Sequence, residues 1–193
     1  MNRAFLPLWI AVLLPLAGCG DRSATSGPPV VREYGADDAS RIVLEAEDGD
    51  IEPPVAVMDE PGASGGRCII VTGGSGKPGE EIPGDPDKKK YPERWGAAVY
   101  KFKVTEPGKY RIWARKWWED GCGNSFTFVV NGGYPVLFGG DSSYDAWEWA
   151  VAPVLFDLKA GENALEVLNR EDGVRLDKLI ITKDADFVPQ GKE

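Results

Sequence analysis

The sequence predicts an all-β fold, a β-sandwich of the jelly-roll type, and two observations carry this prediction. Short apolar runs, about ten in all, follow one another from residue 41 to residue 182, with glycine and proline turns between them. No window longer than about ten residues repeats its apolar side chains at helical spacing. Many short strands without helices pack as two sheets, because each sheet has an apolar face to bury.

The clearest pattern lies in residues 108–133 and predicts a β-hairpin. Two strand-like runs, 110–118 and 125–131, flank a turn, and apolar side chains alternate in the second run as they do on a strand that lies on a core. The turn joins Trp117 and Trp118 to acidic and amide side chains. An indole ring covers the C–H face of a sugar while amides and carboxylates bind its hydroxyls, so this turn favours carbohydrate binding.

The remaining predicted strands are apolar runs bounded by turn residues such as Glu106-Pro107-Gly108. They span 42–47, 55–58, 68–71, 98–104, 147–151, 154–158, 164–168 and 174–182. Residues 73–94 form a long predicted loop in which Gly74, Gly76 and Gly79 match a dinucleotide fingerprint. Prolines that follow within this loop forbid the helix that the fingerprint requires, so we expect no nucleotide site.

Composition narrows the classes of function. The chain has 193 residues, long enough for one well-cored domain, and it contains no histidine. Histidine-dependent triads, His-ligated zinc and imidazole acid/base chemistry are thereby excluded. A formal net charge of -9 disfavours nucleic acid as a partner, and acidity in a chain rich in tryptophan and glycine fits a neutral or cationic ligand, or a bound cation, better.

The N-terminal residues predict a targeting signal. Residues 1–18 combine a short basic start with an apolar run, and Leu16-Ala17-Gly18-Cys19 resembles a bacterial lipobox, in which Cys19 is lipidated after cleavage. The alternative is an ordinary secretory signal. Residues 19–40 are rich in Ser, Pro, Gly and Asp, as in a flexible tether, and the predicted domain spans residues 41–190. We therefore expect a lipid-anchored protein of the bacterial cell envelope, attached to the membrane through its lipid only.

Two further cysteines, Cys68 and Cys122, form an even pair in an oxidising compartment. A disulfide between them and a pair of free thiols are equally compatible with the sequence, because sequence alone does not show whether their Cα atoms approach.

Three carboxylates suggest a metal site. Glu45 and Glu47 are two apart on a predicted strand, which places them on one face roughly 6–7 Å apart. Asp177 lies within the apolar closing strand, an unfavourable position for an unpaired acid. An all-oxygen set of this kind suits Ca²⁺. The alternative is that Lys178 or Arg67 pairs with one of the glutamates.

Several motifs occur in an order that resembles a known family. These are Glu45-Ala46-Glu47, the Gly108–Arg115 strand, Lys159–Asn163 and the closing Leu176–Leu179. Together they resemble the calcium-containing β-sandwich carbohydrate-binding modules of families 6 and 35 and their galactose-binding-like relatives. DGCGNSF at 120–126, NREDG at 169–173 and the tail Phe187-Val188-Pro189 resemble a branch found beside bacterial polysaccharide-degrading proteins.

The resemblance implies a structural Ca²⁺ held by Glu45, Glu47 and Asp177. It also implies ligand binding either at the loop apex or on the concave face of a sheet, with a polysaccharide or glycan as the partner. At the apex the candidate ligand-binding residues are Trp118, Asn124, Tyr144, Trp147, Asn169, Arg170, Glu171 and Asp172.

The leading hypothesis is therefore a non-catalytic, calcium-containing, carbohydrate-binding lipoprotein. An alternative is an envelope lipoprotein that docks on a protein partner through its aromatic turn. A glycan-degrading enzyme is disfavoured, because a glycosidase needs two carboxylates across a cleft and the best pair here, Glu45 and Glu47, is also the best metal candidate.

Overall fold

The computed structural model describes residues 41–76 and 96–192. The predicted signal peptide (1–18), the lipidation site Cys19, the tether (19–40) and most of the long loop lie outside these residues. Within them the chain forms twelve β-strands and two short 3₁₀ turns, which confirms the all-β prediction. Among the described residues there is no helix of the length and apolar character needed to cross a membrane.

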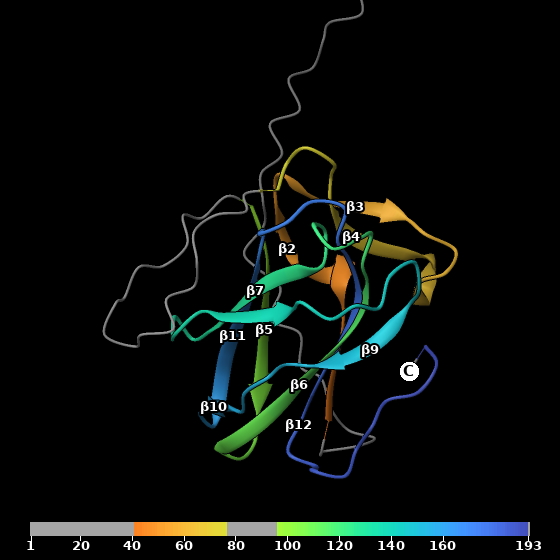
Figure 1. Cartoon of the computed structure of the whole chain (residues 1–193). Helices are drawn as coiled ribbons and strands as arrows, with labels where there is room; N and C mark the ends of the chain where they lie inside the picture. Colours follow the sequence, from red (N-terminus) through yellow and green to blue (C-terminus); the bar gives the residue numbers. More distant parts are fainter. Residues whose placement is uncertain (1–40, 77–95, 193) are drawn as a thin grey trace, which may run out of the picture.

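The larger sheet is built around β6 and β12, and its neighbouring strands run antiparallel (Figure 1). In order it contains β10 (Phe156–Leu158), β6 (Gly108–Trp117), β12 (Arg175–Thr182), β4 (Arg67–Val71) and β3 (Val55–Asp59). Two more strands complete the seven, β1 (Arg41–Glu45) beside β12 and β9 (Glu148–Val151) beside β6.

The smaller sheet has five antiparallel strands. In order they are β2 (Asp50–Glu52), β5 (Ala97–Val104), β11 (Gly161–Leu168), β7 (Ser125–Val130) and β8 (Val136–Gly139). The main core lies between the two sheets, where alternate side chains such as Ile112 and Leu179 from one sheet and Phe102 and Phe128 from the other are fully buried.

One sequence prediction about this fold is wrong. The runs around residues 110–118 and 125–131 are strands, but they do not pair as a hairpin, since β6 belongs to the seven-stranded sheet and β7 to the five-stranded sheet. The connection 118–124 therefore crosses from one sheet to the other. Residues 169–174 cross in the same way from β11 to β12, and the two crossings meet through hydrogen bonds, as described below.

Strand boundaries agree with the sequence to within a few residues, with two omissions and one shortened strand. The short strands β2 and β8 were not predicted; β2 has one apolar side chain, Ile51, between two acids. β1 ends at Glu45, and Ala46–Asp48 form a 3₁₀ turn. Glu45 and Glu47 therefore do not lie on one strand face, contrary to the prediction.

Candidate functional site

Four loops meet at one end of the sandwich and form what we call the loop cluster. Its segments are 72–76 after β4, 118–124 between β6 and β7, 140–147 between β8 and β9, and 169–173 between β11 and β12. Hydrogen bonds link them directly. Gly74 N–H donates to the carboxylate of Asp172, and Asp145 N–H donates to the carbonyl of Trp118 at 3.0 Å.

Glu171 joins the two segments that cross between the sheets. Its buried carboxylate accepts the backbone N–H of Asn124 at 3.0 Å and the hydroxyl of Ser125 at 2.6 Å. The guanidinium of Arg170 pairs with the other oxygen of the same carboxylate and also donates to Ser125. Since these acceptors are engaged within the protein, Glu171 and Arg170 build the cluster's frame.

Asp141 fixes the third segment, although it was not among the candidates from the sequence. It accepts hydrogen bonds from the indole N–H of Trp118 at 3.1 Å, the Lys116 ammonium at 3.0 Å, and the hydroxyl and backbone N–H of Ser143. Burial raises the pKa of Asp141, but the hydrogen bonds from Ser143, Trp118 and Lys116 outweigh this effect and lower it to about 2. The sequence signal that points to this residue is the turn Gly140-Asp141-Ser142-Ser143 directly before Tyr144.

Gly173 is required by the close approach of two loops. Its φ is +75°, and a Cβ at this position would lie 1.9 Å from a carboxylate oxygen of Glu119. Only glycine accepts both the backbone conformation and the contact, so the loops are packed directly against each other.

The structure corrects the prediction for Trp118. Its side chain is 0% exposed and packs against Phe126 and Phe138 with ring centres 6.0 Å away in each case. Its neighbour Trp117 points the opposite way, as the strand alternation requires, and is half-buried under the guanidinium of Arg175 at 3.9 Å. Trp118 therefore presents no face to a ligand, and one face of Trp117 is covered by Arg175.

The other predicted ligand residues divide into buried and accessible groups. Asn169 is 5% exposed and donates its amide to the Ser75 carbonyl, so it belongs to the frame with Arg170 and Glu171. Tyr144 is 37% exposed and lies on the loop cluster, whereas Asn124 and Asp172 are half-buried. Trp147 is also half-buried, against Gly62 and the guanidinium of Arg115, whose carbon lies 5.0 Å from the ring centre.

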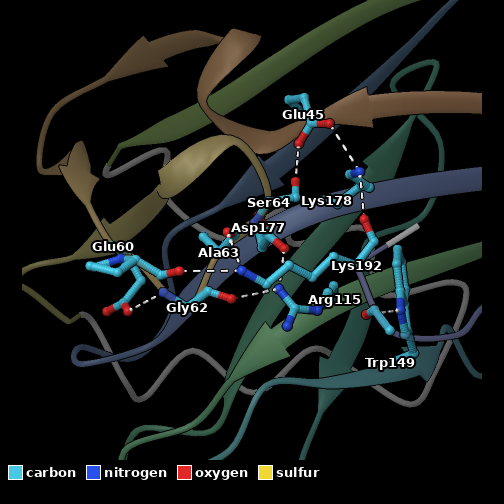
Figure 2. A network of polar contacts seen from close by, with 12 residues as sticks. Glu45, Glu60, Gly62, Ala63, Ser64, Arg115, Trp149, Asp177, Lys178 and Lys192 are labelled. Atoms are coloured by element: carbon cyan, nitrogen blue, oxygen red, sulfur yellow. Dashed lines mark hydrogen bonds and ion pairs between the residues drawn. The ribbon is translucent and has the colours of Figure 1, made fainter.

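Two of the three predicted metal ligands, Glu45 and Asp177, bind Ser64 of the turn Ser64–Gly66 (Figure 2), and a carboxylate oxygen of Glu47 lies beside Gly65 of the same turn. Asp177 is fully buried; it accepts the Ser64 N–H at 2.8 Å and pairs with Arg115. Glu45 accepts the Ser64 hydroxyl and pairs with Lys178 at 3.0 Å. As these side chains lie, no three acidic groups within residues 41–76 and 96–192 are arranged to hold a metal ion.

Glu47 is the least satisfied of the three carboxylates. One oxygen lies 3.7 Å from the Arg67 guanidinium, which is itself half exposed, and the other oxygen is buried without a hydrogen-bond partner. Burial, with a further contribution from the charge of Glu45, raises the pKa of Glu47. All-oxygen chemistry and an unpaired buried oxygen are features that suit a hard cation, whereas the neighbouring bases compete with one.

The C-terminal residues reach this same corner after passing over the outer face of the larger sheet. Phe187 is buried beneath Arg41, whose guanidinium carbon lies 3.9 Å from the ring centre, and the Trp149 indole donates to the Gly191 carbonyl at 3.1 Å. Lys192 donates to the carbonyls of Pro61 and Ala63 and accepts from Lys178 at 2.9 Å (Figure 2). We call residues 187–192 the C-terminal strap.

Cys68 and Cys122 are both free thiols, so the possible disulfide between them is not formed. Cys68 is buried in β4, and burial raises its pKa to about 12. Cys122 is exposed in the loop cluster.

Comparison with known proteins shows which solved structures share this fold. No protein-family model and no curated protein matches the sequence. The structure is similar to a family 35 carbohydrate-binding module from Clostridium thermocellum, with a TM-score of 0.52 and 19% identity over 73% of this chain and 98% of the module. A second structure of a family 35 module from that organism gives a TM-score of 0.53 with 16% identity, covering 74% of this chain and 97% of the module.

Parts of larger enzymes share the fold. The Podospora anserina GH26-CBM35 β-(1,4)-mannanase matches with a TM-score of 0.58 and 15% identity over 79% of this chain. The Phanerochaete chrysosporium exo-β-1,3-galactanase, in complex with β-1,3-galactotriose, matches with a TM-score of 0.53 and 23% identity over 74% of this chain. The matched region spans 29% of each enzyme. The chain thus has the β-sandwich fold of the family 35 modules.

Proposed function

We propose that this chain binds a polysaccharide or glycan and breaks no bond in it, as a non-catalytic protein with the fold of the family 35 carbohydrate-binding modules. The observation that carries the proposal is the likeness to isolated family 35 modules, which extends over nearly their whole length. The matched enzymes share only a fraction of their length with this chain, so their catalytic activities are not transferred to it.

We place the binding site at the loop cluster. Tyr144 supplies an exposed aromatic ring there, and Asn124 and Asp172 supply polar groups beside it on loops held by Glu171 and Asp141. Such a rigid frame with one aromatic ring suits a saccharide, because little conformational entropy is lost on binding. The C-terminal strap crosses the outer face of the larger sheet, which favours the cluster over that face as the site.

Glycan binding by the Tyr144→Ala variant tests the location. Loss of ring contact should weaken binding about tenfold, equivalent to about 1.4 kcal/mol. Tyr134→Ala is the matched control, because Tyr134 is 39% exposed but lies between β7 and β8 at the opposite end of the strands. A glycan array probed with the wild-type chain tests the function itself, and a chain that captures no glycan would contradict it.

We also propose a structural Ca²⁺ bound by Glu45, Glu47 and Asp177. The convergence of these carboxylates on Ser64–Gly66 and the unpaired buried oxygen of Glu47 support the proposal. Arg115 and Lys178 already pair with Asp177 and Glu45, so the ion would have to displace these bases, and its largest gain would be at Glu47, which Arg67 approaches only to 3.7 Å. Lipidation at Cys19, placement in the bacterial cell envelope and nearby polysaccharide-degrading enzymes complete the proposal and rest on sequence motifs alone.

A further inference from the structure

The charges of the loop cluster are unevenly placed between its surface and its interior. Glu119, Asp120 and Asp145 are exposed and acidic. The basic groups point inward, since Lys116 is 1% exposed and bound to Asp141, and Arg170 is engaged by Glu171 and Ser125. A ligand that approaches the described part of the cluster therefore meets carboxylates, with the positive charges already neutralised beneath them.

An unsatisfied polar atom in the same cluster points in the same direction. The side-chain amide of Asn169, 5% exposed, donates to the Ser75 carbonyl at 2.9 Å, while its oxygen is buried without a hydrogen-bond partner. An unpaired acceptor is satisfied by a hydroxyl or an ammonium group, and never by a carboxylate or sulfate. The unpaired oxygen of Asn169 and the surface carboxylates are independent features, and both favour a ligand that donates hydrogen bonds.

Two of these three exposed acids, Asp120 and Glu119, are held by contacts within the cluster. Asp120 accepts the backbone N–H groups of Cys122 at 2.7 Å and Gly123 at 3.0 Å, and Glu119 is wedged against Gly173. For Asp145 the backbone is held, since its N–H donates to the Trp118 carbonyl at a turn position with a φ of 55°. Charges fixed within about 10 Å of a bound anion repel it at ordinary ionic strength.

From these observations we infer that the loop cluster selects saccharides that carry hydroxyl or amine groups and no acid groups, and that it rejects uronates and sulfated sugars. This inference rests on the proposed glycan binding at the same site. Its chemical basis is that neutral and amine-bearing sugars offer donors to the acceptors of the cluster, whereas an anionic sugar adds like charge and meets no unengaged basic group among the described residues of the cluster.

The test measures binding of the whole chain, purified in detergent, to an array of matched glycans at low and high salt. Each backbone is presented in an acidic and an uncharged form, such as homogalacturonan and its methyl ester, and chitosan is paired with its acetylated form. We expect the methyl ester to bind at least about tenfold more tightly than the acidic homogalacturonan at low salt, and chitosan to bind at least as tightly as its acetylated form. We also expect this difference to shrink as salt rises.

A charge-neutralising variant assigns the selectivity to the cluster. Asp120→Asn combined with Asp145→Asn keeps the side-chain size, and asparagine accepts the positive φ at 145. It should raise the affinity for the acidic members about tenfold and leave the uncharged members nearly unchanged. Asp157→Asn is the control, since this residue is 76% exposed but lies on β10, opposite Lys109 at the start of β6 and far from the cluster.

The possible outcomes are distinct. Preference for uncharged or amine-bearing forms that the double variant weakens supports the inference. Equal or tighter binding of acidic forms overturns it while leaving the proposed function intact, and so does a preference that the double variant does not alter. Binding to no member of the array overturns the proposed function and the inference with it.

Discussion

At the scale of single residues, the loop end of the sandwich depends on buried side chains that hold accessible ones. Trp118 is the clearest case, because sequence made it a candidate for stacking on a sugar and the structure places it in the core. The alternation along β6 shows why, since Ile112 and Ala114 face the core and the same alternation carries Trp118 inward. Its indole N–H, which is bound to Asp141, then becomes part of the frame.

Replacing Trp118 should therefore affect stability before it affects binding. Trp118→Ala leaves a cavity against Phe126 and Phe138 and should lower the free energy of unfolding by about 3–5 kcal/mol. Urea unfolding followed by circular dichroism measures the loss. Trp147→Ala is the comparison, and because that side chain is only half-buried it should cost clearly less. Equal losses for the two variants would show that Trp118 is not a core residue.

Asp141 gives a pH-dependent prediction. Because the pKa of Asp141 in the folded state is about 2, below its ordinary value of 3.8, its ionised form stabilises the fold. That contribution is complete above about pH 4 and is lost as the pH falls toward 2. We expect Asp141→Asn to melt at a lower temperature than wild type at neutral pH, with the difference narrowing in acid. Parallel melting curves across this range would contradict the assignment, and Asp157→Asn supplies the surface control.

At the scale of elements, the sequence predicted most strands and misjudged how they connect. Alternation reveals β7, and apolar runs between turn residues reveal β5, β6, β11 and β12, because both patterns are local properties of the chain. Whether a turn joins two strands of one sheet or crosses to the other sheet depends on distant packing, and the residues 118–124 look the same in either case. β2 was not predicted because its single apolar side chain, Ile51, stands between two acids, and β8 was also not predicted.

The same reasoning explains which parts of the candidate site sequence could find. Tyr144, Asn124 and Asp172 were recognised from the resemblance, and the structure brings their loops together. The partner of Asp177, by contrast, is Arg115, which is 62 positions away in sequence. Pairings of that kind follow from the register of β6 and β12, including the irregularity between Leu176 and Lys178, which local patterns do not encode.

The C-terminal strap gives a prediction for an element without regular structure. A chain that ends at Asp186 loses the burial of Phe187 and the contacts of Lys192 with the turn at 61–63. Removal of one buried Phe alone should cost about 1.5–3 kcal/mol. Thermal unfolding of the truncated chain measures this. Val188→Ala, at a position 56% exposed, is the control and should stay within about 0.5 kcal/mol of wild type.

At the scale of the whole molecule, the two sheets, the strap and the proposed ion form one unit. Removal of the ion should therefore lower the stability of the whole domain. If Ca²⁺ binds the folded state only, a hundredfold excess over its Kd adds about 2.7 kcal/mol. A chelator should then lower the melting temperature by roughly 5–10 °C for a domain of this size. The measurement is a pair of melting curves, with calcium and with chelator.

Glu47→Gln is the informative variant for that experiment, because it removes the least satisfied carboxylate and retains a polar side chain of similar size. Its melting temperature should respond less to chelator than that of the wild type. If wild type and variant both melt identically with and without chelator, no ion is bound, and the carboxylates are neutralised by Arg115, Lys178 and Arg67.

The contrast between the two cysteines of the described residues offers a practical consequence. Cys68 is buried with a pKa of about 12, whereas the thiol of Cys122 is exposed on the loop cluster. A maleimide dye should therefore react with Cys122 and spare Cys68. The label would sit on the rim of the surface that we assign to glycans, and its emission would report saccharide capture in solution as it happens.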